Sequence, residues 1–261
     1  MKFTDCLNPK RPPLVAMITN TSIDDAISEI TSAIYDGADA IGISLCHLEK
    51  KYRDAESYDK LFAACIGKPV YVYCYPAIEC AGLSYEECME ILIFAAERCK
   101  AYSPVICDIM CDTFDKGAKE GFSYDPIAAE KQMAVTERIH GIGAQVLYSV
   151  HHKEFLGEEE IVRQARIQVE RGADLVKIVT QARTREELMA NLEIINKLKI
   201  ELDRPVLYLS GGRYSHQIRQ VGPAFGSCMY LVVDNYNAYA TKMQPSLRST
   251  KAIRDSLIIV D

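Results

Sequence analysis

A lysine inside an apolar run is the residue of this sequence that most directly suggests chemistry. Lys177 lies in the stretch DLVKIVT, residues 174–180, whose central side chains are otherwise branched and apolar. Burial of an unpaired ammonium is costly, so such a position favours the neutral amine. A neutral amine condenses with a ketone or aldehyde to form a Schiff base. The alternative is a structural lysine whose stem packs in the core and whose head group pairs with a carboxylate.

Two adjacent histidines, His151 and His152, end the apolar run that precedes the one containing Lys177. Imidazole is the side chain best suited to proton transfer near neutral pH. Neighbouring strands lie ~4.8 Å apart, so a histidine at the end of one strand stands beside a lysine on the next. Because successive strand residues face opposite ways, only one of the two imidazoles can share the side of Lys177.

These residues belong to a regular alternation of short apolar runs and longer helical patterns. The runs are near-continuous in Val, Ile, Leu and Tyr, as expected of strands buried on both faces. They cover residues 14–18, 40–45, 70–75, 105–109, 145–150, 175–179, 206–210 and 228–233. Helical patterns cover residues 24–35, 58–65, 85–101, 126–140, 158–171, 185–202, 215–221 and 246–257.

Local signals at the helix ends support this alternation. Gly37, Gly143 and Gly172 each stand between a helical pattern and a strand, where glycine supplies the left-handed residue that ends a helix. Ser84, followed three residues later by Glu87, forms a capping-box signature. Eight βα units without a break in composition predict one domain, residues 1–261, folded as a single (β/α)8 TIM barrel. The competing open, doubly wound sheet lacks its Gly-x-Gly-x-x-Gly turn after the first run.

Composition and charge exclude several classes of protein. The chain has 261 residues, 49% of them hydrophobic and 25% charged, which is typical of a folded globular protein. Its net charge of −6 argues against nucleic acid or an anionic membrane as partner. No stretch approaches the ~20 apolar residues of a membrane span, and the beginning, MKFTD, lacks an apolar signal region. The ten cysteines lie mostly in apolar surroundings, so we expect reduced thiols and a cytoplasmic location.

In a parallel barrel the active site gathers at the C-terminal ends of the strands, so polar residues there are the candidates. Besides those already described, the candidates are Cys46, His47, Cys74, Tyr75, Asp108, Cys111, Asp112, Ser149, Ser210 and Arg213. Thiols and imidazole suit zinc, but the spacing of Cys46, His47, Cys74, Cys107 and Cys111 matches no compact zinc motif. We predict that no metal is bound.

The order and spacing of these motifs resemble those of the type I 3-dehydroquinate dehydratases. The resemblance rests on YSVHH at 148–152 followed by KI at 177–178, and on SGG at 210–212 followed by Arg219. It continues with FGS at 225–227 and with Gln244 before a proline. It extends from Pro13 to about Leu257 and is most specific between the fifth and seventh strands.

The resemblance implies a hydro-lyase of the shikimate pathway, in aromatic amino acid biosynthesis, that converts 3-dehydroquinate into 3-dehydroshikimate and water. Lys177 would form an imine with the C3 ketone, which makes the C2 proton removable. His151 matches the general acid/base that takes this proton and later protonates the departing C1 hydroxyl. Arg219 matches an arginine that holds the substrate carboxylate, and Gln244 a glutamine on a loop that closes over the substrate. The resemblance implies no metal or organic cofactor, and a homodimer.

The first half of the chain departs from the family pattern. The family has a Glu-x-Arg-x-Asp pattern on the second strand, and we assign Ile43, Leu45 and His47 to these three positions. On the third strand, Tyr75 replaces an arginine of the family. The fourth-strand Asp-x-Glu, whose glutamate orients the histidine, reads DIM at 108–110. Tyr75 and His47, with Ser210, are therefore the remaining candidates for substrate binding.

Substrate hydroxyls that face Ile43 and Leu45 would lose hydrogen bonds, at a cost of several kcal/mol. We therefore expect 3-dehydroquinate to be a poor substrate. An imine-forming dehydratase or aldolase acting on a different, less hydroxylated oxo-carboxylate is the main alternative. A metal-binding protein and a catalytically silent barrel are the other two.

Overall fold

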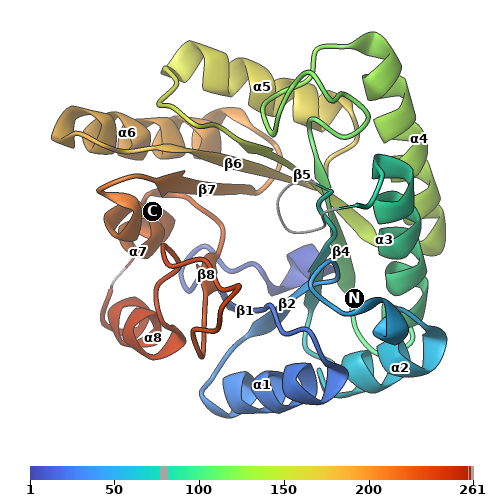
Figure 1. Ribbon diagram of the computed structural model, residues 1–261. Coiled ribbons are helices and arrows are strands. Elements are labelled where there is room, and N and C mark those ends of the chain that lie inside the picture. Colours follow the sequence, from blue (N-terminus) through green and yellow to red (C-terminus); the bar gives the residue numbers. More distant parts are fainter. Residues whose placement is uncertain (77–81, 258, 260–261) are drawn as a thin grey trace.

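The computed structural model describes residues 1–76, 82–257 and 259. Within these residues, eight strands alternate with eight α-helices (Figure 1). The strands are β1 (Leu14–Ile18), β2 (Ala40–Ser44), β3 (Val70–Tyr73), β4 (Val105–Met110), β5 (Gln145–His151), β6 (Leu175–Gln181), β7 (Val206–Gly211) and β8 (Tyr230–Val232). The helices are α1 (Ile23–Tyr35), α2 (Ala55–Ala63), α3 (Tyr85–Cys99), α4 (Pro126–Ile142), α5 (Glu158–Glu170), α6 (Arg185–Glu201), α7 (Ser215–Phe225) and α8 (Leu247–Ser256). Short 3-10 helices cover Phe3–Cys6 and Lys50–Tyr52.

The strands form one parallel sheet in the order β7-β6-β5-β4-β3-β2-β1-β8, curled with the helices on its outer side (Figure 1). At the junction of β7 and β8, the N–H of Cys228, two residues before β8, donates to the carbonyl of Val206, on β7, at 2.8 Å. The predicted (β/α)8 barrel is confirmed, and every strand except β8 begins at its predicted residue. Sequence locates these strands well because each is apolar on both faces.

The predicted helix ends are confirmed as well. Gly37, Gly143 and Gly172 have φ angles of 99°, 83° and 97°, which lie in the left-handed region that favours glycine. Ser84 Oγ accepts from the N–H of Glu87, whose carboxylate accepts in return from the N–H of Ser84. These local interactions stop and start helices where the chain must turn back to the barrel.

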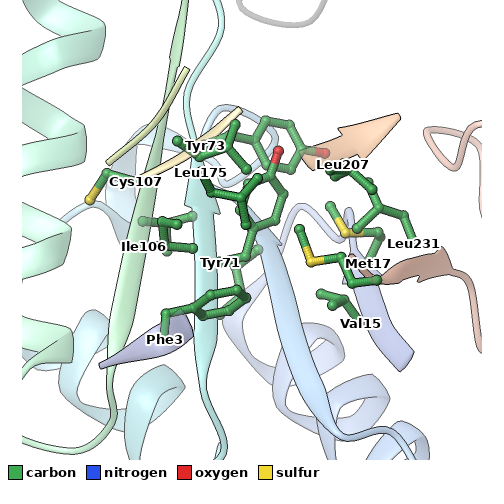
Figure 2. Close-up of a cluster of buried hydrophobic side chains, with 14 of the residues drawn as sticks. Phe3, Val15, Met17, Tyr71, Tyr73, Ile106, Cys107, Leu175, Leu207 and Leu231 are labelled. Atoms are coloured by element: carbon green, nitrogen blue, oxygen red, sulfur yellow. The ribbon is translucent and has the colours of Figure 1, made fainter. Parts of the chain in front are cut away.

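The N-terminal segment closes one end of the barrel. Phe3 is fully buried and packs below Tyr71, close to Val15 and Ile106 (Figure 2). The N–H of Thr4 donates to the side chain of Gln145, at the start of β5, at 2.9 Å. With its N-terminal end filled in this way, the barrel is left with its C-terminal end for a ligand.

The second strand presents small residues to the barrel interior. A Cβ placed on Gly42 would lie 2.3 Å from Met17 Sδ, which shows that Gly42 faces inward. By the alternation of strand residues, Ser44 shares this face, and Ile43 and Leu45 point outward to the helices. The expectation that Ile43 and Leu45 line the substrate site is therefore wrong.

The described cysteines and helices complete this picture. No disulfide bond joins any two of the nine described cysteines, and Cys80 lies outside the described residues. None of the described helices combines the length and the apolar character needed to cross a membrane.

A buried arginine holds loop 111–125, which follows β4. Arg171 donates to Gln132 Oε1 at 2.9 Å and to the carbonyl of Ser123 at 2.7 Å, and its guanidinium lies over the ring of Phe122. Gln132 in turn donates to two carbonyl groups of the same loop. The loop therefore depends on polar groups that have no access to compensating water.

We expect Arg171→Ala to lower the free energy of unfolding by about 2–4 kcal/mol, because it leaves buried acceptors without donors. Urea unfolding measures this change. The matched control is Arg163→Ala, which removes an exposed, solvent-screened pair with Glu160 and should change the free energy of unfolding much less. Equal losses in the two variants would contradict the assignment.

Candidate active site

A cavity of about 360 Å³ lies at the C-terminal end of the barrel, beneath the loop that follows β8. Seven residues are given a catalytic or substrate-binding role by the sequence, and five of them line this cavity: Lys177, His151, Arg219, Gln244 and Tyr75. They come from β6, β5, α7, the loop after β8 and the end of β3. The barrel thus brings together residues that are far apart in the chain.

Lys177 lies at the inner end of this cavity and is only 5% exposed. Its Nζ donates to Asp108 Oδ2 at 2.9 Å, to Tyr71 Oη at 3.0 Å and to Tyr75 Oη at 3.1 Å. The lysine is therefore paired with a carboxylate, as the structural alternative expects, and it also borders a cavity, as the catalytic alternative requires.

Asp108, on β4, is fully buried, and both of its carboxylate oxygens accept hydrogen bonds. Its Oδ1 accepts from Ser149 Oγ at 2.5 Å, and its Oδ2 accepts from both phenols as well as from Lys177. Burial and the negative charge of Asp108 raise the pKa values of Tyr71 and Tyr75 well above the usual range. Both phenols therefore stay protonated and act as donors.

His151 lies one pleat nearer the mouth than the lysine. In the β5–β6 register, Ser149 is opposite Lys177 and His151 is opposite Val179. Its Nε2 has no hydrogen-bond partner within the described part of the chain. Burial, followed by the charge of Lys177, lowers the pKa of His151 to about 3. The imidazole is therefore neutral at physiological pH and can accept a proton.

The neighbouring histidine is directed elsewhere, as strand alternation requires. His152 Nε2 lies 2.8 Å from Gln164 Oε1, on α5. The backbone N–H of His152 donates to the carbonyl of Val179. Its imidazole is thus committed to the helix layer, although the residue borders the cavity.

Arg219 is a buried cation that has no carboxylate partner among the described residues. It is 6% exposed, its Nε donates to the carbonyl of Ser210 at 3.2 Å, and no carboxylate of the described residues lies within ion-pair distance. Burial lowers its pKa to about 10, so the guanidinium remains charged at neutral pH. An unpaired cation in a cavity wall is a site for an anionic group of a ligand.

Gln244 belongs to the loop that follows β8. It is 8% exposed, its N–H donates to the carbonyl of Thr241 at 2.9 Å, and its own carbonyl accepts from the Tyr236 hydroxyl. Thr241 and Met243 also line the cavity, so this loop forms one wall of the mouth.

The remaining two candidates lie outside the cavity lining. Ser210 is fully buried, its Oγ has no partner among the described residues, and its carbonyl is what contacts Arg219. Its side chain faces outward because Gly211, the next residue, faces the cavity. His47 Nδ1 lies 2.7 Å from Ser44 Oγ, and its ring lies 4.9 Å from that of Tyr239.

The residues considered for zinc do not form a site. No group of three or more His, Cys, Asp or Glu side chains is placed to hold a metal ion in residues 1–76 and 82–257. Cys107 alternates with Asp108, which faces the barrel interior, and so points toward the helices.

The sequence nominates Asp108, Tyr75 and Ser149 as polar residues at strand ends, but it does not indicate that they surround Lys177, and it misses Tyr71. Asp108 lies in the apolar run VICDIM and therefore carries the same signal as Lys177. Tyr71 precedes Tyr75 by four residues, a spacing that puts both rings on one face of a strand. These patterns single out Asp108 and Tyr71, but not their contact with Lys177.

The fold and the site define a (β/α)8 barrel with a lysine-centred cavity at its C-terminal end. A model of the family "Type I 3-dehydroquinase" matches residues 115–257, which include Lys177, His151, Arg219 and Gln244. The chain belongs to this family.

Solved structures agree on the fold. Type I 3-dehydroquinate dehydratase from Clostridium difficile has a TM-score of 0.79 and 18% identity, covering 95% of this chain and 93% of that one. The enzyme from Geobacillus kaustophilus HTA426 has a TM-score of 0.77 and 14% identity, with 94% and 90% covered. The enzyme from Enterococcus faecalis has a TM-score of 0.76 and 16% identity, with 99% of each chain covered. None of the curated proteins matches the chain.

The lowered pKa of His151 makes the stability depend on pH. Between the ordinary value of 6.5 and about 3, the unfolded chain binds a proton that the folded protein does not, so stability falls as the pH falls through this window. From pH 7 to pH 4, we expect the wild type to lose about 2–3 kcal/mol more than His151→Gln. Urea unfolding at several pH values measures both curves, and parallel curves would contradict the assignment.

Proposed function

We propose that this protein is a Schiff-base-forming lyase that acts on an oxo-carboxylate. The observation that carries the proposal is the position of Lys177 Nζ at the inner end of a cavity that His151 and Arg219 also line. Nucleophile, base and anion-binding cation are the three groups that imine chemistry on an oxo-acid requires.

The reaction follows from these groups. Lys177 Nζ attacks the substrate carbonyl carbon, and loss of water gives the imine, which draws electrons from the adjacent C–H bond. His151 Nε2, which is neutral and without a partner within the described part of the chain, takes that proton. It then returns the proton to a departing β-hydroxyl group, which leaves as water. Hydrolysis of the imine frees the product and Lys177.

The charges of the cavity orient the substrate. The ammonium of Lys177 is already neutralised by Asp108, whereas the guanidinium of Arg219 has no carboxylate partner in the described residues. A substrate carboxylate therefore binds at Arg219 and leaves the carbonyl group for Lys177. The C. difficile relative is described with covalently modified comenic acid, an oxo-pyran carboxylic acid, which supports covalent chemistry with oxo-acids in this family.

The wall formed by β1, β3 and β4 suits a substrate with few hydroxyl groups. Met17 and Met110 face the cavity there, and the hydroxyls of Tyr71 and Tyr75 are engaged with Asp108. These residues, rather than Ile43 and Leu45, are the reason that we expect a poor fit for 3-dehydroquinate. We propose 3-dehydroquinate dehydration as the family reaction, and a less hydroxylated oxo-carboxylate as the better substrate.

Trapping the imine tests the proposed chemistry. With 3-dehydroquinate or comenic acid and borohydride, we expect a reduced adduct on Lys177, located by peptide mass spectrometry. Lys177→Ala should lose the adduct and all turnover. The matched control is Lys153→Ala, which removes an exposed lysine at the cavity rim and should keep the adduct. A catalytically silent barrel would give no adduct on Lys177 with either compound.

A kinetic comparison tests the proposed specificity. We expect kcat/KM for 3-dehydroquinate to lie below ~10⁴ M⁻¹s⁻¹ and to be exceeded by that for a less hydroxylated acid such as 4-hydroxy-2-oxopentanoate. Arg219→Ala should weaken the binding of both substrates by a few kcal/mol, since both substrates carry a carboxylate. Efficient turnover of 3-dehydroquinate would show that Glu120, Gln181 or Thr241, which also line the cavity, recognise its hydroxyls.

A further inference from the structure

We propose that Tyr75 is the catalytic acid that releases water from the carbinolamine on Lys177, and that Asp108 supplies its proton. This inference rests on the proposed function, because it concerns how the imine forms. It assigns roles to two side chains that surround the amine rather than to the imidazole at the mouth.

The contacts of the reacting nitrogen carry the assignment. Tyr75 Oη lies 3.1 Å from Lys177 Nζ and also donates to Asp108 Oδ2, the oxygen that accepts from the amine at 2.9 Å. Nitrogen, carboxylate and phenol therefore form a closed group in which a proton can pass from the amine to Asp108 and from Asp108 to the phenol. A hydroxyl on the carbon bonded to Nζ lies within reach of that phenol.

A second phenol makes the same contacts from deeper in the barrel. Tyr71 Oη lies 3.0 Å from Lys177 Nζ and also donates to Asp108 Oδ2. Tyr71 is 1% exposed and lies in the packed interior (Figure 2), whereas Tyr75 lies four residues nearer the C-terminal end and is 9% exposed. The ring of Tyr75 also meets that of His151 edge-on, with 5.8 Å between centroids. Both phenols border the cavity, but Tyr75 lies nearer its mouth, is the more exposed of the two and is the one that meets His151, so it is the phenol placed to reach a substrate hydroxyl.

The proton balance closes without any further reactant. The ammonium of Lys177 gives one proton to Asp108, and the free amine adds to the carbonyl carbon, with its second proton passing to the new oxygen. The C–O bond then breaks, and the departing hydroxide takes the Tyr75 proton while Tyr75 takes the proton held by Asp108. Water, a positively charged iminium and the ionised carboxylate of Asp108 result. The initial ion pair is replaced by another, so no net charge is created in the buried site.

His151 is less suited to this step. It lies one pleat toward the mouth from the lysine, opposite Val179, where it can reach the C–H bond next to the imine. Because its pKa is lowered, the imidazole is neutral at neutral pH and holds no additional proton to donate until it has taken one from the substrate. The raised pKa of Tyr75 means that a phenolate does not persist at this position. None is needed, because Asp108 gives Tyr75 a proton at the same time as Tyr75 gives its own proton to the departing hydroxide. Two separate groups thus serve imine formation and proton abstraction.

The test compares Tyr75→Phe with its matched control, Tyr71→Phe. Each variant removes one donor to Asp108 and one acceptor for Lys177, so a purely structural role predicts equal effects. Glyoxylate, the smallest oxo-carboxylate, is the probe, because its reaction does not depend on the far wall. The reaction is quenched with borohydride at increasing times, and the adduct on Lys177 is quantified by mass spectrometry. Circular dichroism verifies that both variants are folded.

We expect Tyr75→Phe to slow adduct formation by about 10²-fold and Tyr71→Phe by less than about tenfold, with similar final amounts of adduct. In Tyr75→Phe alone, the rate should fall as the pH rises and should increase with the concentration of imidazolium buffer, which replaces the missing acid. Equal slowing in both variants, or a Tyr75→Phe rate that does not respond to buffer acid, overturns the inference. If Tyr75→Phe does not fold, Asp108→Glu, which keeps the acid but displaces it from Tyr75, must slow adduct formation and make the rate increase with imidazolium buffer; an unchanged rate overturns the inference. Absence of an adduct on Lys177 in the wild type overturns the proposed function itself, which separates the two failures.

Discussion

The structure depends on one buried ion pair, between Lys177 and Asp108. Both side chains are almost completely removed from solvent, and such a pair is tolerated only when its remaining donors and acceptors are satisfied. Tyr71, Tyr75 and Ser149 provide these contacts, so the carboxylate accepts four hydrogen bonds from four different side chains. The same cluster that stabilises two charges inside an apolar barrel also holds the amine at the inner end of the cavity.

Barrel geometry is what makes this cluster possible. Residues of β3, β4, β5 and β6 contribute to it, and these four strands are consecutive neighbours in the sheet. Parallel pairing sets Ser149 opposite Lys177 and Asp108 opposite Tyr73, so alternate residues of each strand meet at one level of the interior. Below that level the N-terminal segment fills the barrel with apolar side chains (Figure 2), and above it the cavity begins.

The two cations of the cavity have different partners, and this difference determines how a substrate is oriented in the site. Lys177 is neutralised by Asp108, whereas Arg219 is held by a backbone carbonyl and has no carboxylate beside it in the described residues. An anionic ligand is therefore drawn to Arg219. The family pattern described above has ionic groups on the second and third strands. In this protein, Gly42, Ser44 and the tyrosines of β3 occupy the interior instead. The polar end of the cavity is kept, and the opposite wall is less polar.

The sequence by itself determined the alternation of strands and helices, the barrel and the nomination of Lys177 and His151. These follow from local composition and spacing, because a strand buried on both faces is apolar throughout and a charged residue within it stands out. Arg219 was nominated by the resemblance to the type I family alone. Only the tertiary structure decided which side of each strand faces inward. On β2 it is Gly42 and Ser44 that face the interior, so Ile43 does not line the cavity as the sequence led us to expect. It also decided the partners of Lys177, since Asp108 and Tyr71 lie 69 and 106 residues away in the chain. Contacts at such separations depend on which strands become neighbours and on their register, which no local pattern encodes.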